Sequence, residues 1–117
     1  MAGVGGFVII KGITPAYDLL PLSGSSVPYD TPPTFSWSAE HSGKYQVRVS
    51  DTPSFTVLRM TSKTTDAYWQ TDTQWTPDPA KWKRVADTYQ TIYWMVVSKD
   101  PIGRTSSSIS SSLDITR

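Results

Sequence analysis

Residues 91–108 read TIYWMVVSKDPIGRTSSS, and this stretch decides the fold class. Its first half is rich in β-branched and aromatic residues, and DPIG at 100–103 is typical of a tight turn that ends on glycine. The segment therefore predicts a strand that enters a hairpin. Both alternate sets of its residues are apolar, and the pattern alone does not fix which set faces the core. We expect Ile92, Trp94, Val96 and Ser98 inside, which leaves Tyr93, Met95 and Val97 on an outer face that something must cover.

Further strands follow from alternation elsewhere in the chain. Phe35 and Trp37 share one face of 34–38, and 44–50 alternates without exception. We expect Tyr45, Val47 and Val49 inward, Gln46, Arg48 and Ser50 in water, and a turn at 40–43 in which Gly43 takes a positive φ. Residues 57–60 and 108–117 predict two more strands, and the proline-dense segment 17–33 suits a sheet edge. A single helical turn is predicted at 80–87, with Pro79 at its start.

Composition bounds the remaining choices. The 117 residues fit one domain, with a predicted boundary between an arm at 1–15 and a sandwich at 16–117. There is no cysteine, so disulfides, thiolate metal sites and cysteine nucleophiles are excluded. The formal charge of +1 supplies no broad basic surface for nucleic acid. The apolar run at 7–10 is too short for a signal peptide or a spanning helix, so we expect no membrane insertion.

Several short pieces, in order, resemble a fibronectin type III-like domain, especially the divergent kind repeated in large bacterial extracellular proteins. The resemblance implies an all-β, antiparallel, seven-stranded Greek-key sandwich with Trp37 in its core, no catalytic residues and no cofactor. It also implies a place outside the cell or on its surface, within a longer chain. Two departures are Ile92, where the family usually has a tyrosine, and the long basic segment at 80–90. The pieces are Leu20-Pro21 with Gly24, Pro33–Trp37, Tyr45–Asp51 with Phe55, Tyr93–Val96 with Asp100 and Gly103, and Ser112–Ile115.

Catalytic and metal sites are hard to build from these residues. His41 is the only histidine and Glu40 the only glutamate, and both fall in the predicted turn. No nucleophile elbow or phosphate-binding glycine loop is present. Asp66, Asp72 and Asp78 lack the alternating spacing of a calcium loop. The sequence therefore predicts a protein that is not an enzyme and binds no cofactor or metal.

The function that we expect is protein–protein contact, adhesion or spacing of neighbouring domains. Candidate contact residues are Tyr93, Met95 and Val97 on the outer face, and Phe7 and Ile9 of the arm, which could add a strand to a neighbour or join copies of this chain. A self-assembling virion decoration or tail protein is one alternative. Another is a module that binds a polysaccharide through Trp69, Trp75 and Trp82, although aromatics that cap the sandwich are the favoured interpretation of these three.

Overall fold

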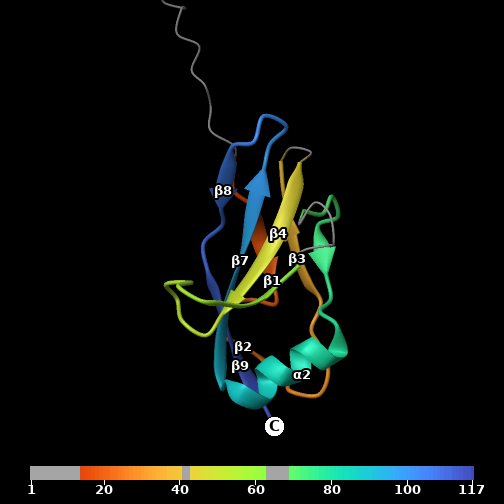
Figure 1. The fold of residues 1–117 in the computed structure, drawn as a ribbon, viewed down its shortest axis with the longest axis vertical. Coiled ribbons are helices and arrows are strands. Elements are labelled where there is room, and N and C mark those ends of the chain that lie inside the picture. The colour runs from red at the N-terminus through yellow and green to blue at the C-terminus, as the bar shows by residue number, and fades with distance from the viewer. Residues whose placement is uncertain (1–13, 41–42, 63–68) are drawn as a thin grey trace, which may run out of the picture.

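The strand predicted from residues 91–98 lies at the centre of the larger of two sheets. Figure 1 shows the fold as a computed structural model, which describes residues 14–40, 43–62 and 69–117. Strand β7 (Thr91–Lys99) pairs antiparallel with β4 (Lys44–Ser50) on one side and with β8 (Thr105–Ser107) and β9 (Ser111–Thr116) on the other. The order of the larger sheet is β2-β9-β7-β4-β5, with β8 beside β7, where β2 is Ser25–Pro28 and β5 is Leu58–Thr61.

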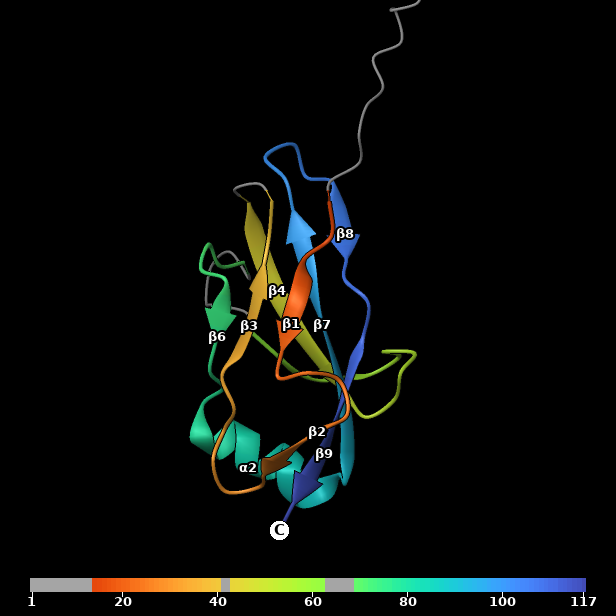
Figure 2. The ribbon, with the colours of Figure 1, turned by 180° about the vertical axis from the view of Figure 1, so that it is seen from behind.

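The smaller sheet has the order β1-β3-β6 and packs against the larger one (Figure 2). Its strands are β1 (Tyr17–Leu20), β3 (Phe35–Ser38) and β6 (Gln74–Trp75). The rings of Phe35 from this sheet and Trp94 from the larger sheet lie 4.6 Å apart, centroid to centroid. Both side chains are fully buried. The chain is therefore an all-β, sandwich-like fold with a mixed aromatic and aliphatic core.

The predicted register of β7 is confirmed. Ile92, Trp94 and Val96 are fully buried between the sheets, opposite the equally buried Val47 and Val49 of β4. The predicted inward residues of the last strand, Leu113 and Ile115, are also fully buried. In β4 and β9 period-two alternation located the core face, because a one-residue slip would have exposed the apolar set.

The expected count of seven strands is wrong for the described residues, which contain nine. The predicted edge segment contains two strands, β1 and β2, because the chain crosses at Pro21–Gly24 from the smaller sheet to the larger one. There β2 pairs with β9 in parallel, so the sandwich is not purely antiparallel. The last strand divides at residues 108–110, between β8 and β9.

Three expectations for the region around β4 are also wrong. Ser50 is fully buried rather than solvated, because its hydroxyl donates to the Val57 carbonyl (2.8 Å) and the loop at 51–57 covers it. Gln46 is only 8% exposed and accepts a hydrogen bond from the Arg48 guanidinium at 2.7 Å. Gly43 does not have a positive φ; a side chain there would approach the Lys99 carbonyl oxygen to 3.0 Å. Glycine is needed at that position for a close approach of two backbones rather than for a turn.

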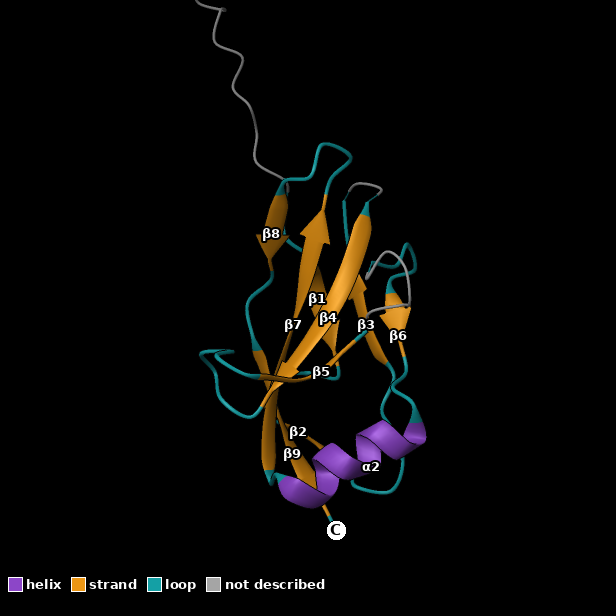
Figure 3. Cartoon of the chain, in the orientation of Figure 1, coloured by secondary structure: helices purple, strands orange, loops and turns teal. Residues whose placement is uncertain are grey.

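The predicted helix is present as α2 (Pro79–Thr88), which crosses the end of the sandwich near β2 and β9 (Figure 3). Pro79 occupies its first turn, and the Asp78 carboxylate caps it by accepting from the N–H groups of Ala80 and Lys81, both at 3.1 Å. Trp82 is fully buried and donates through Nε1 to the Pro28 carbonyl at 3.2 Å. The helix therefore closes an end of the core. No helix among the described residues has the length and apolar character needed to cross a membrane.

Candidate docking groove

One of the two long sides of the sandwich is closed by a segment that bonds to both sheets. Gln70 exchanges two backbone hydrogen bonds with Tyr45 of β4, at 2.7 and 2.8 Å. A few residues later β6 pairs with β3 of the smaller sheet. On the opposite side the described residues provide no such bridge: β1 bonds only to β3, and β8 bonds only to β7. The edges of β1 and β8 therefore face each other there, with no strand of the described residues between them.

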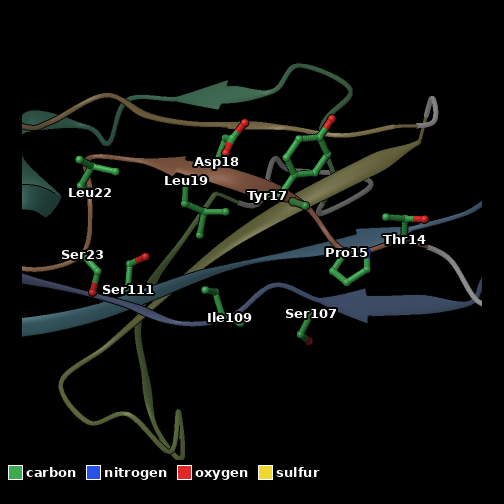
Figure 4. Close-up of a pocket in the computed structure, with 11 residues that line it drawn as sticks. Thr14, Pro15, Tyr17, Asp18, Leu19, Leu22, Ser23, Ser107, Ile109 and Ser111 are labelled. Carbon is green, nitrogen blue, oxygen red and sulfur yellow. The ribbon is translucent and has the colours of Figure 1, made fainter.

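An apolar groove of about 520 Å³ lies on this open side. Figure 4 shows Leu19 and Ile109 projecting into it from opposite walls. Asp18 is the one charged side chain among the described residues that line the groove. One wall belongs to the segment that contains β1, and the other to the segment that contains and follows β8. The first wall consists of Thr14–Leu19, Leu22 and Ser23, and the second of Ser107, Ile109 and Ser111.

The groove concentrates exposed apolar surface. Ile109 is 83% exposed, the highest value of any large hydrophobic side chain in the described part of the chain, and Leu22 is 65% exposed. Tyr17 adds a ring that is 43% exposed. Contiguous exposed apolar surface that is rimmed by serines is typical of a contact site.

Local geometry explains why Ile109 points outward. The Val96 N–H donates to Ser108 Oγ at 2.9 Å, and the Ser108 N–H donates to the Val96 carbonyl at 2.8 Å. Ser108 Oγ in turn donates to the Ile109 carbonyl at 2.9 Å. These bonds hold Ser108 against β7, so the next side chain is directed away from the sheet. Ile109 therefore has a defined position on the groove wall.

The opposite wall is formed by a β1 strand that departs from regular pairing. Asp18 has a φ of 51°, and the register between β1 and β3 shifts between Tyr17 and Leu20. An aspartate tolerates this left-handed conformation better than most residues. The irregularity separates the two buried residues of this wall, Ala16 and Leu19, by three positions rather than two.

The predicted outer face of β7 is partly covered by its own neighbours. Val97 is 3% exposed, while Tyr93 and Met95 are half-buried. Their cross-strand partners on β4 are the polar residues Ser50, Arg48 and Gln46. The face therefore offers two partly exposed side chains rather than an apolar patch. Phe7 and Ile9, the other predicted contact residues, lie outside the described residues, as do His41 and Asp66.

The three tryptophans predicted for sugar binding do not share an exposed face. Trp82 has no exposed surface. Trp75 stacks on Phe35 with ring centroids 5.7 Å apart. Trp69 is half-buried, and the Lys99 ammonium lies 5.1 Å from its ring centroid. Trp75 is half-buried as well, so full burial excludes only Trp82 from contact with a sugar ring.

Three separate ion pairs are present among the described residues. Arg59 donates to Asp51 at 2.8 Å and Arg104 to Asp100 at 2.7 Å. Lys83 on α2 pairs with Asp87 at 2.9 Å, which raises the pKa of its ammonium. The same ammonium lies 5.2 Å from the Tyr29 ring centroid. The described residues contain no group of three or more His, Cys, Asp or Glu that could hold a metal ion.

Sequence reasoning missed the groove residues Tyr17, Leu22 and Ile109. A signal for Ile109 was present: it is a single apolar residue in the polar run TSSSISSS at 105–112. Leu22 gave no such signal, because its exposure depends on where the chain crosses between the sheets. The groove arises from tertiary structure, since its two walls are about ninety residues apart in the chain.

Comparisons with known proteins show no family for this chain. No family model matches the chain, and no curated protein matches it. Among solved structures it is similar to an engineered protein whose crystal structure was determined at 1.98 Å. The two sequences are 14% identical, the TM-score is 0.48, and the match covers 84% of this chain. It covers 19% of the engineered chain, so this protein spans about a fifth of that structure.

Proposed function

We propose that this chain is a non-catalytic, fibronectin type III-like module that works by protein–protein contact at the groove between β1 and β8. The observation that carries the proposal is an apolar groove bounded by two strand edges. An extended segment placed there can bond to free backbone groups and bury side chains at once. The resemblance of the sequence to bacterial surface repeats supports a place in a longer surface or secreted protein.

Strand order supports the fibronectin-like part of the proposal. When β2 and β8 are set aside, three strands remain in one sheet and four in the other. The chain passes from β3 to β4 and β5, returns to the smaller sheet at β6, and crosses again to β7. Such crossings between sheets are typical of Greek-key sandwiches. Trp37, the expected core residue, lies in β3 and is 5% exposed. The helix between β6 and β7 is the main departure from the family pattern.

Two alternatives have different support. Sugar binding through the tryptophans is disfavoured, because stacking needs an exposed ring face and Trp82 has none. Self-assembly, as in a virion structural protein, would use the same groove, with a second copy of this chain as the partner. The groove is therefore the place at which these functions are to be tested.

The proposal is tested by titrating isotope-labelled protein with a large excess of the extended peptide TVTFTVK, observed by NMR. We expect saturable shifts at the backbone amides of Tyr17–Leu19 and Ser107–Ser111. Ile109→Asp should weaken binding at least about tenfold, because it places a charge where an apolar side chain must be buried. Binding that is absent, or that spreads over the whole surface, would contradict the proposal.

A matched control distinguishes binding in the groove from nonspecific binding to exposed apolar side chains. Ile102 is the same residue type, is 75% exposed, and does not line the groove. Ile102→Asp should leave the peptide affinity unchanged. Equal losses in the two variants would mean that the peptide binds any exposed isoleucine, and the proposed groove function would fail.

A further inference from the structure

The chain carries a segment whose length and chemistry match the groove. Phe7–Ile10 is the apolar run of the N-terminal arm, and it has four residues, as β1 does. Its side chains are all large and apolar, and it contains no charge or proline that would oppose a buried added strand. It therefore suits a site that offers apolar walls and free strand edges.

The described chain begins at the groove, and only a short connection joins Phe7–Ile10 to that point. Thr14 and Pro15 line one end of the groove, and three residues, Lys11-Gly12-Ile13, separate them from Ile10. Roughly two to five residues suffice to reverse a chain in a β-hairpin, and a glycine in the connection provides the conformation that such turns need. A segment tethered this closely has an effective concentration in the millimolar range.

We propose that Phe7–Ile10 occupies the groove of its own chain as an added strand beside β1. This inference rests on the proposed function, because it names how the same groove is regulated. A partner strand then binds only after it displaces the chain's own segment.

The absence of cysteine makes disulfide trapping a direct test in the full chain. Ile109→Cys is combined with Val8→Cys in one variant and with Ile9→Cys in another, because adjacent residues of a strand point to opposite faces. We expect one of the two pairs to oxidise to an intramolecular disulfide, seen as a monomer that has lost two hydrogens. The other pair should remain reduced.

A control pair shows whether trapping reflects proximity. Arg84 is exposed on α2, at the end of the sandwich remote from Thr14 (Figure 2). Ile9→Cys with Arg84→Cys should not form a disulfide within the chain. The inference would be overturned if neither Ile109→Cys pair formed more intramolecular disulfide than this control pair. A disulfide-linked dimer would also overturn it, since the segment would then belong to a second copy.

The peptide titration separates failure of the inference from failure of the proposed function. If the chain's own segment fills the groove about nine-tenths of the time, Phe7→Ser with Ile9→Ser should strengthen TVTFTVK binding about tenfold. Peptide binding without any trapping would overturn the inference alone. Trapping without peptide binding, even in this double variant, would overturn the proposed function, because the groove would serve only its own segment.

Discussion

Ser108 satisfies both backbone polar groups of Val96: its hydroxyl accepts from the Val96 N–H and its N–H donates to the Val96 carbonyl. Ser62 makes the same two bonds to Val47: its hydroxyl accepts from the Val47 N–H at 2.7 Å, and its N–H donates to the Val47 carbonyl at 3.0 Å. Val47 and Val96 lie directly opposite each other in the larger sheet. The two serines therefore complete the ladder on both flanks of this pair, just beyond the last residues of β5 and β8.

Ser108→Ala should lower the free energy of unfolding by about 1–3 kcal/mol, because it leaves the Val96 N–H without its acceptor in a buried place. Equilibrium denaturation in urea measures this change. Ser110 is exposed and two residues away, so Ser110→Ala is the matched control and should change stability by less than about 0.5 kcal/mol. Equal effects of the two substitutions would refute this role for the Ser108 hydroxyl.

Asp78→Ala should cost about 0.5–2 kcal/mol, since two N–H groups at the start of α2 lose their acceptor. The loss should appear in urea unfolding as a lower midpoint with an unchanged slope. Asp87→Ala, on the exposed side of the same helix, removes only a surface ion pair and should have a much smaller effect. A larger loss from Asp87→Ala would contradict the assignment of Asp78 as the cap.

Trp82→Ala should destabilise the protein by about 3–5 kcal/mol, because Trp82 is fully buried between α2 and the end of the sandwich. Trp82→Phe should cost less, since a ring still fills most of the space while the bond to the Pro28 carbonyl is lost. Trp69→Ala is the comparison, because Trp69 is only half-buried. A loss from Trp82→Ala no greater than that from Trp69→Ala would refute a core role for Trp82.

The sequence predicted the core well and the candidate site poorly, for a physical reason that particular residues show. Buried positions such as Trp94 and Val47 repeat every second residue, because neighbouring side chains of a strand point to opposite faces. Helix α2 was also predictable, from Pro79 and the spacing of Trp82 and Val85. Tyr17 and Ile109 follow no period, because their exposure depends on strands that end early and on a chain that crosses between sheets.

Buried polar residues were a second source of error. Ser50 and Gln46 alternate with the core residues of β4 and were expected in water. The loop at 51–57 covers Ser50, and the Gln46 side chain accepts from Arg48. No local pattern predicts such cover, since it depends on a loop conformation and on a neighbouring side chain.

Stability should fall as the pH drops below about 4, because two carboxyl groups are ionised more readily in the folded chain. Burial alone would raise the pKa of Asp100, but hydrogen bonds from the Arg104 guanidinium, from the Arg104 N–H and from the Ile102 N–H outweigh it and lower that pKa. The hydrogen bond from Arg59 lowers the pKa of Asp51. The unfolded chain therefore binds protons first as the pH falls.

Asp100→Asn should accordingly flatten the dependence of the urea midpoint on pH below about 4, while leaving part of it to Asp51. Arg104→Gln removes the guanidinium while keeping its backbone N–H, and it should flatten the same curve by a smaller amount. Both variants are measured from about pH 6 downward, where the stabilising contribution of the ionised carboxylates is fully present at the start. A slope equal to that of the unaltered chain in both variants would show that Asp100 does not contribute to acid sensitivity.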